Sequence, residues 1–342
     1  MCNNLEFGYF LQSAILVSDV DGSPLAPLYL GVEAATGVHS SRRQTPLPRR
    51  RQLDELNRTF GYIEGIGLDK GCVHIVDRQA DSLLHLRRFA RCGRKFVIRS
   101  NDVRRVRHRG ANKLLKEVEE SLQNELKYVR EVEHRGKRAW QYVTETTVVL
   151  EQMGRTKCPA ATAPNKRKLI KGKPLELRLV ISEVRDKSGQ VLATWRLWSN
   201  VEEQAEAEEI ALWYYWRWRI ESFFKLLKKG GQQLEQWQQE SAEAIAKRLL
   251  VVAQTCVLVW TLAISKEEQA VGLREFLVSL SGRQMKRGVA YTASALLVGM
   301  WQFLAIIDAL ERHTTAELQE IANEFLRLLG SESNFKDVKE LV

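Results

Sequence analysis

Cysteine and histidine are scarce in this sequence, and neither falls in a pattern that binds zinc. The five cysteines show no paired short spacing, and the six histidines form no ligand pair. These absences argue against a zinc ribbon and a disulfide framework, and they are typical of proteins from a reducing cytosol. No signal peptide is recognisable at the N-terminus. The sequence therefore predicts a cytoplasmic protein.

Long apolar runs are also few. The longest, residues 249–264, contains Gln254 and Thr255 and is shorter than a membrane-spanning helix requires. It predicts a helix in the core of the fold, and we expect no membrane association.

What the chain has instead is length, apolar content and an excess of positive charge. Its 342 residues, 44% of them hydrophobic, are enough for one large domain or two ordinary ones. Lys and Arg number 52 against 42 Asp and Glu, a net charge of +10. This excess favours a polyanionic partner such as nucleic acid. Many soluble proteins are mildly basic, however, so charge alone leaves the partner open.

The first half of the chain shows strand patterns separated by turn signals. Residues 11–38 alternate around Asp21-Gly22, which predicts a β-hairpin because Asp-Gly supplies the positive φ of a tight turn. Asp19 and Asp21 are then turn residues rather than metal ligands. Residues 39–51 contain five arginines and two prolines and predict a loop, which either contacts DNA phosphates or is simply solvated.

A strand, a helix and a second strand follow at 72–76, 82–91 and 95–100, after a helix predicted over 52–69. This order predicts parallel strands, with Asp77 at the carboxyl end of the first. Open α/β sheets place their ligands at such ends, so Asp77 is a candidate metal ligand. The alternative is that Asp77 caps the next helix. Asp81, beside Ser82, is expected to be a helix cap.

Charged and β-branched segments alternate over the next hundred residues. Residues 101–130 favour helix, and Arg104 and Arg105 there are either phosphate contacts or part of a solvated helix end. Residues 139–200 predict strands, with a loop over 154–174. Trp195 and Trp198 lie in this strand pattern, which favours a place in the core or an interface over the alternative that they stack on DNA bases. Further helices are predicted at the ranges 203–229, 241–264, 271–280, 293–312 and 317–329.

Polar residues form one line within the segment 213–229, WYYWRWRIESFFKLLKK. Read as one helix at about 100° per residue, Tyr214, Arg217, Glu221 and Lys228 fall within roughly a 60° arc. One interpretation is ordinary salt bridging, since Arg217 and Glu221 are four residues apart. The other is a metal-binding glutamate flanked by phosphate-binding side chains.

The spacing of these four residues matches a known signature. Tyr214, Arg217, Glu221 and Lys228 are separated by two, three and six residues, as in the Tyr-Arg-Glu-Lys signature of bacterial insertion-sequence transposases. The chain resembles the DDE enzymes of the insertion sequence four family. Residues 76–81, Val-Asp-Arg-Gln-Ala-Asp, are similar to that family's second catalytic aspartate motif. The resemblance extends over most of residues 10–310.

The resemblance implies an α/β fold with a ribonuclease H-like mixed sheet, a β-rich insertion before the catalytic helix and a C-terminal helical region. The implied regions are the N-terminal part of the core at 1–130, the insertion at 131–200, the glutamate-bearing helix and a core helix at 201–265, and the helical region at 266–342.

The resemblance also implies roles for individual residues. Asp77 and Glu221 would be catalytic carboxylates that hold Mg²⁺ or Mn²⁺, cations that prefer oxygen ligands. Tyr214, Arg217 and Lys228 would contact the DNA of the element ends, where the planar fork of arginine suits phosphate. The implied reaction is metal-dependent cleavage at element ends and strand transfer into target DNA. It would be carried out by a homodimer associated with the bacterial nucleoid.

The sequence departs from the family pattern at its start. The family's first aspartate lies on a strand ahead of the hairpin at 11–38, whereas here only MCNNLEFGYF precedes it. We therefore expect an N-terminally truncated transposase. The alternative is a catalytically inactive remnant that binds element-end DNA, and a host nuclease with the same core is a third possibility.

Overall fold

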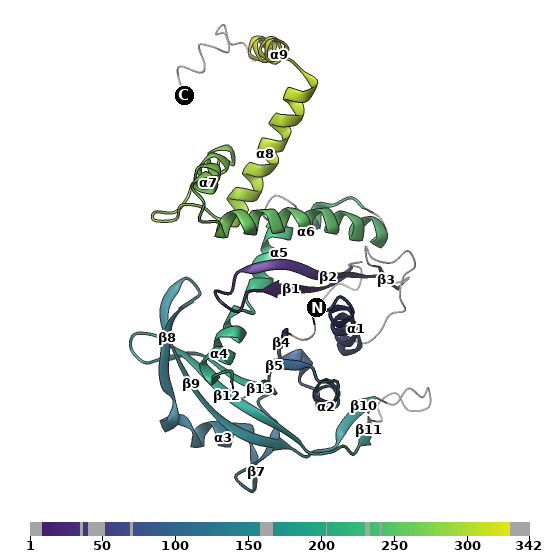
Figure 1. Cartoon of the computed structure of the whole chain (residues 1–342), viewed down its shortest axis with the longest axis vertical. Helices are drawn as coiled ribbons and strands as arrows, with labels where there is room; N and C mark the ends of the chain where they lie inside the picture. The colour runs from purple at the N-terminus through teal and green to yellow at the C-terminus, as the bar shows by residue number, and fades with distance from the viewer. Residues whose placement is uncertain are drawn as a thin grey trace, which may run out of the picture. The chain divides into compact units, whose positions relative to one another are not determined.

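The structure is a computed structural model of the whole chain (Figure 1). It describes residues 9–34, 37–39, 52–68, 71–157, 167–202, 204–229, 233–239 and 241–328. The chain forms two units, the first made of Met1–Glu221 with Ser241–Lys247 and the second of Ser222–Glu240 with Arg248–Val342. Apart from His39, the basic segment predicted as a loop at 39–51 lies outside the described residues.

The first unit begins with a small antiparallel sheet, which confirms the predicted hairpin. Its strands are β1 (Phe10–Val17), β2 (Pro24–Ala34) and β3 (Gly37–His39), in that order. Gly22 has a φ of +70°, and the Asp21 side chain accepts a hydrogen bond from the Ser23 amide at 2.9 Å. Asp21 is therefore a turn residue, as predicted.

The main sheet of the first unit is mixed and has the order β4-β5-β13-β12-β9-β6-β7, with β8 paired to β9. Its strands are β4 (Val73–Val76), β5 (Lys95–Arg99), β6 (Arg105–His108), β7 (Ala111–Leu114), β8 (Lys127–His134), β9 (Lys137–Leu150), β12 (Leu175–Arg185) and β13 (Val191–Ser199). β4 and β5 are parallel, as predicted, and helix α2 (Leu83–Arg91) connects them. The strands of the predicted β-rich region thus continue the sheet that carries Asp77.

Both faces of this sheet are covered, so its strands alternate between two cores. Phe96 and Ile98 of β5 belong to a core shared with α2 and α1 (Gln52–Gly65), whereas Val97 belongs to a core shared with α4 (Ala207–Trp216). This alternation follows from the period of two in a β-strand. Trp195 and Trp198 are buried, one in each core, which confirms the prediction that they are core residues.

Two sequence expectations in this unit are wrong for part of their range. Residues 101–130 are mainly β6, β7, β8 and the short helices α3 (Leu115–Ser121) and η2 (Gln123–Glu125). Exposed Arg105 and Arg107 alternate with buried Val106 and His108, so a period of two overrides helix propensity there. Within the predicted loop at 154–174, β10 (Gly154–Lys157) and β11 (Arg167–Ile170) pair as antiparallel strands.

The helix predicted as continuous over 203–229 is divided. α4 ends at Trp216 and α5 (Arg219–Lys229) begins two residues later. Between them the amides of Arg217, Ile220 and Glu221 bond to carbonyls three residues back, which tightens the turn. Such 3₁₀ geometry within a helical stretch rotates the following side chains away from their α-helical positions. The single continuous helix is therefore wrong, although Arg217 still lies beside both Tyr214 and Glu221.

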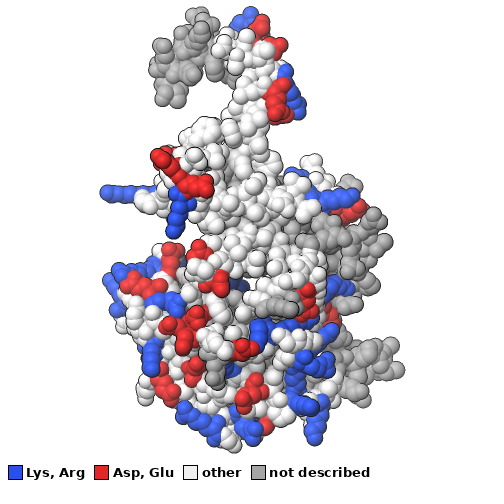
Figure 2. Space-filling view, in the orientation of Figure 1, with Lys and Arg blue, Asp and Glu red and all other residues white. Residues whose placement is uncertain are grey.

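The second unit is helical. Its elements include α7 (Glu268–Leu280), α8 (Ala293–Arg312), α9 (Thr315–Leu328) and most of α6 (Ala242–Ile264). Ser241 caps α6 by accepting the Ala244 amide, as predicted. Among the described residues, α6 and α8 are long and apolar enough to cross a membrane, a property that core helices of soluble proteins also have. Much of the visible surface of α8 is uncharged (Figure 2), with exposed Trp301, Leu304 and Ile306.

Candidate active site

Asp77 directly follows β4 at the edge of the main sheet. The last residue of β4, Val76, pairs with Ile98 of the parallel strand β5, so the carboxyl ends of both strands meet at this edge. Asp77 Oδ1 accepts a hydrogen bond from the Arg78 amide at 2.7 Å and begins the short helix η1 (Arg78–Ala80). The sequence left two interpretations of Asp77, and the structure shows both the capping bond and the strand-end position.

One arginine joins Asp77 to the glutamate of the later helix. Arg217 Nη2 lies 3.7 Å from Asp77 Oδ2 and 3.6 Å from Glu221 Oε1. The side chain of Arg217 is 16% exposed, against 38% for Asp77 and 42% for Glu221. The guanidinium also lies over the rings of Tyr214 and Trp218, 5.6 and 5.2 Å from their centres. The structure therefore brings together the two carboxylates that the sequence singled out.

Tyr214 completes the connection between α4 and the sheet edge. Its hydroxyl donates to Asp77 Oδ1 at 3.2 Å, and its ring is 1% exposed and packs against Trp195. Burial, followed by the charge of Asp77, raises the pKa of Tyr214 to about 12. The phenol is therefore a proton donor near neutral pH.

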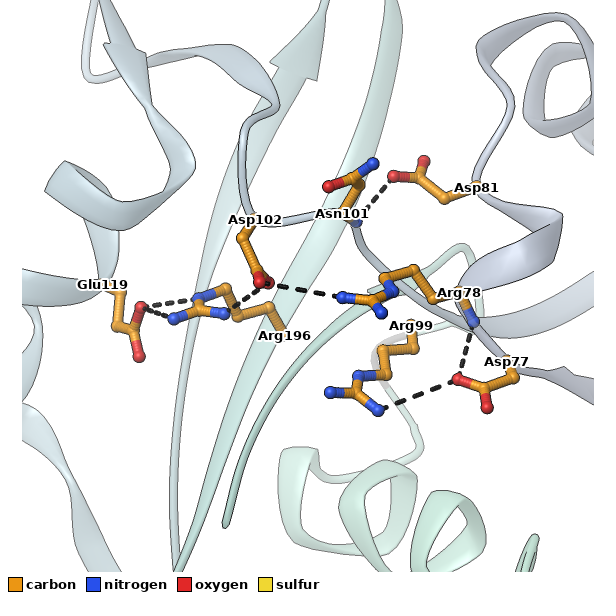
Figure 3. A network of polar contacts seen from close by, with 8 residues as sticks. All are labelled: Asp77, Arg78, Asp81, Arg99, Asn101, Asp102, Glu119 and Arg196. Atoms are coloured by element: carbon orange, nitrogen blue, oxygen red, sulfur yellow. Dashed lines mark hydrogen bonds and ion pairs between the residues drawn. The ribbon is translucent and has the colours of Figure 1, made fainter. Parts of the chain in front are cut away.

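Sequence reasoning missed Arg99 and the residues beside it. Arg99 Nη1 lies 3.9 Å from Asp77 Oδ1, and Arg78 Nη1 lies 3.8 Å from Asp102 Oδ2 (Figure 3). Arg99 is the last residue of β5, so the strand-end rule that selected Asp77 also applies to it. Asp102 in turn pairs with Arg196 at 2.8 Å.

The charge of Asp77 is maintained by its neighbours. Burial alone would raise the pKa of this carboxyl, but the Arg78 amide, the Arg217 charge, the Tyr214 hydroxyl and the Arg99 charge together hold it below its usual value of 3.8. Asp77 is therefore ionised at neutral pH, as a metal ligand must be.

A polar pocket opens at this strand edge. It has a volume of about 420 Å³ and is lined by Asp77, Arg78, Gln79, Arg99 and Asn101. One acidic and two basic side chains in one pocket suit a ligand that combines a phosphate with a cation.

A family model described as transposase DDE domain matches residues 32–259, a range that contains every site residue above. The chain belongs to the DDE transposase family. No curated protein matches it. Transposases act on DNA, and enzymes of this family generally use divalent metal ions. The mixed α/β architecture is consistent with a DDE domain.

The other predicted DNA contacts of this DDE domain lie in different places. Lys228 is exposed on α5, in the part of that helix that belongs to the second unit. Arg105 is exposed at the start of β6. Arg104, 19% exposed, instead lies against Asp81, with Arg104 Nη2 2.6 Å from Asp81 Oδ1. Asp81 does not cap α2 as expected, because its carboxylate is bonded to residues from other segments.

The donor set of this DDE domain suits a hard cation. Asp77 and Glu221 would be the residues that hold such a cation, because each presents a carboxylate oxygen to the Arg217 guanidinium. Mg²⁺ is commonly held by one or two carboxylates together with water and substrate phosphate. Among the described residues, no group of three or more His, Cys, Asp or Glu side chains is arranged to hold a metal ion.

Proposed function

We propose that this chain is a transposase of the insertion sequence four type, which cleaves DNA at element ends and transfers the strand into target DNA. The observation that carries the proposal is the position of Arg217, within 4 Å of both Asp77 and Glu221. Two of the four signature residues, Tyr214 and Arg217, contact the strand-end Asp77, and a third, Glu221, pairs with Arg217. We also infer that the main sheet belongs to a ribonuclease H-like core.

In this proposal Asp77 and Glu221 hold Mg²⁺ or Mn²⁺, which when bound activates water and stabilises charge on the leaving oxygen. Before DNA binds, Arg217 and Arg99 offset the charge of Asp77. These contacts, between 3.7 and 3.9 Å, are long for charge-assisted hydrogen bonds. A phosphate can therefore draw the guanidinium groups away from Asp77, and the carboxylate is then available to the cation.

DNA contacts in this proposal come from Tyr214, Arg217, Lys228 and Arg105. The hydroxyl of Tyr214 stays protonated and can donate to a phosphate oxygen as well as to Asp77. Exposed Lys228 and Arg105 contribute positive charge, which gives affinity but little sequence information. We further propose that two copies of the chain pair two element ends in the bacterial cytoplasm, with no membrane involved.

Replacement of Glu221 by Gln tests the proposal, because the amide keeps the shape and removes the charge that holds a cation. Metal-dependent nicking of DNA that carries the element's inverted repeats should be abolished in Glu221→Gln and in Asp77→Asn. Glu208→Gln is the matched control, since Glu208 is an exposed glutamate of α4. Nicking by Glu221→Gln at the rate of the control would disprove the assignment.

A second function is favoured by the carboxylate count. Among the described residues, Arg217 brings only two carboxylates together at this site, those of Asp77 and Glu221, and no group of three or more possible ligands is arranged to hold a metal ion. A catalytically inactive chain that binds element-end DNA is therefore the alternative. It predicts salt-sensitive binding to the inverted repeats without nicking in Mg²⁺ or Mn²⁺. Nicking at the repeat ends by the unmodified chain would exclude it.

A further inference from the structure

Asp81 is a buried carboxylate whose partners come from distant parts of the sequence. Its side chain is 1% exposed. Oδ1 accepts from Arg104 Nη2 at 2.6 Å and from Trp198 Nε1 at 3.2 Å, while Oδ2 accepts from the Asn101 amide at 2.7 Å. A carboxylate so far from solvent needs a cation and several donors to offset its desolvation. Arg104 supplies the cation.

These hydrogen bonds connect four segments of the chain at Asp81. Asp81 ends η1, Asn101 follows β5, Trp198 lies in β13, and Arg104 immediately precedes β6. Arg104 Nη2 also donates to the Asp81 carbonyl at 2.9 Å. The guanidinium is therefore engaged twice by the same residue, which leaves it poorly placed to contact a DNA phosphate.

The connected segments form the two walls of the pocket beside Asp77. One wall is the turn Asp77-Arg78-Gln79, which leads to Asp81, and the other is the end of β5 with Arg99 and Asn101. Figure 3 shows the Asp81 carboxylate directed at the Asn101 backbone, from one wall to the other. The hydrogen bond from Asn101 to Asp81 thus links the two walls directly.

We propose that Asp81 and Arg104 are a positioning pair that sets the width of this pocket and so holds Asp77 opposite Arg99. The charge of Arg104 is offset by the carboxylate of Asp81. The neighbouring Arg105 is exposed to solvent and is the residue available to phosphate. The predicted effect of this pair on cleavage rests on the proposed function, whereas its predicted effect on the pocket walls does not.

The deciding experiment compares Arg104→Gln with Arg105→Gln, the same chemical change at adjacent positions. Amide hydrogen exchange is followed residue by residue in the full-length protein without DNA. In Arg104→Gln, exchange of the Asn101 amide and of the Arg78 amide, which bonds to Asp77, should accelerate at least tenfold. In Arg105→Gln both should keep the wild-type rate.

The exchange rate of the Arg78 amide distinguishes a role of Arg104 in positioning the pocket walls from a role in stabilising its own loop alone. If Arg104 only stabilised its own loop, the Asn101 amide would exchange faster and the Arg78 amide would not. That result would overturn the proposal. Should Arg104→Gln fail to fold, Arg104→Lys replaces it. Lysine keeps the charge but lacks the fork that reaches both the carboxylate and the carbonyl. The same acceleration at Arg78 is expected there, to a smaller extent.

DNA binding gives an independent reading that needs no catalysis. In a plot of the logarithm of end-DNA affinity against the logarithm of salt concentration, the slope should become about one unit shallower in Arg105→Gln. It should stay unchanged in Arg104→Gln. A loss of slope in Arg104→Gln would make Arg104 a phosphate contact and overturn the assignment.

If the chain nicks DNA, Arg104→Gln should lower kcat at least tenfold with KM unchanged, and Arg104→Lys should restore part of it. Absence of nicking in every variant would count against the proposed function alone.

Discussion

Tyr214 donates its phenolic hydrogen to Asp77 across 3.2 Å, although 137 residues separate them in the sequence. The bond joins α4 to the residue that directly follows β4. The phenol is buried and its pKa is raised to about 12, so it acts only as a donor at neutral pH. The carboxylate gains a partner that stabilises its charged form.

Tyr214→Phe should therefore shift the ionisation of Asp77 without disturbing the packing of α4. One of the groups that lower the pKa of Asp77 is lost, so this pKa should rise toward its usual value of 3.8. The free energy of unfolding at pH 7 should fall by about 1 kcal/mol, the typical net contribution of one hydrogen bond. Carbon-detected NMR of the carboxyl group and urea unfolding measure the two effects.

The control for this change is Tyr128→Phe, which removes a hydroxyl from a tyrosine that is 53% exposed. Its unfolding free energy should stay within about 0.5 kcal/mol of the wild type. An unchanged pKa of Asp77 in Tyr214→Phe would show that the hydrogen bond contributes nothing to the charge of the site.

His74 should make the stability of the first unit depend on pH. It lies in β4, is 8% exposed and stacks on Phe60 with ring centres 3.9 Å apart. Burial, and then the charge of Arg94, lowers its pKa from 6.5 to about 4. The unfolded chain thus binds a proton in a range where the folded chain does not. The resulting stability is complete above about pH 6.5 and falls as the pH drops toward 4.

The size of this effect follows from about 1.4 kcal/mol per pKa unit, which gives a loss of roughly 3 kcal/mol over the window. In His74→Phe the loss should shrink by that amount, although His85 and His108, whose pKa values burial also lowers, keep part of it. Urea unfolding at pH 7, 6, 5 and 4 is the measurement. An identical pH dependence in the wild type and in His74→Phe would refute the assignment.

Gly22 should tolerate no side chain, because two separate constraints meet there. Its φ of +70° disfavours other residues, and a Cβ atom would lie 2.5 Å from ring atoms of Trp216. Trp216 ends α4, and Arg219 at the start of α5 donates to the Gly22 carbonyl at 2.9 Å. The first hairpin therefore supports the helix junction that carries Arg217.

Gly189→Ala provides the matched comparison, since Gly189 has a φ of +84° and open space around its Cα. It should cost about 1–2 kcal/mol, the strain of a positive φ alone. Gly22→Ala should cost that amount plus a further 1–3 kcal/mol for overpacking. Urea unfolding compares the two. Equal costs would show that the contact with Trp216 carries no energy.

The parts of the site that sequence reasoning placed correctly depend on local rules. The strand-helix-strand order put Asp77 at the carboxyl end of β4, and Asp-Gly marked the first turn. Each inference needs only a few neighbouring residues. The parallel pairing of β4 with β5 then follows from the length of the connection.

The parts it missed depend on contacts between distant segments. Asp81 has the sequence context of a helix cap, but its carboxylate is bonded to Asn101 and Trp198, which lie 20 and 117 residues away. The tightened turn at Arg217 interrupts a stretch whose helix propensity is continuous. In both cases burial against other elements overrides the local preference.

Gly299 should also be sensitive to an added side chain, for a reason confined to the second unit. A Cβ atom at this position of α8 would lie 1.9 Å from the backbone carbonyl oxygen of Leu277 in α7, which cannot turn aside as a side chain can. Gly299→Ala should therefore force the two helices apart and destabilise the unit by about 1–3 kcal/mol.

The matched control is Gly272→Ala in α7, where nothing lies within 4 Å of the added atom. That change should stabilise the helix by about 1 kcal/mol, because alanine has the higher helix propensity. The same Gly→Ala change is thus expected to destabilise the protein at position 299 and to stabilise it at position 272. This difference separates the effect of the close approach at Leu277 from the effect of helix propensity. Thermal unfolding of full-length variants measures both, and a stabilising Gly299→Ala would mean that α7 and α8 do not pack at this point.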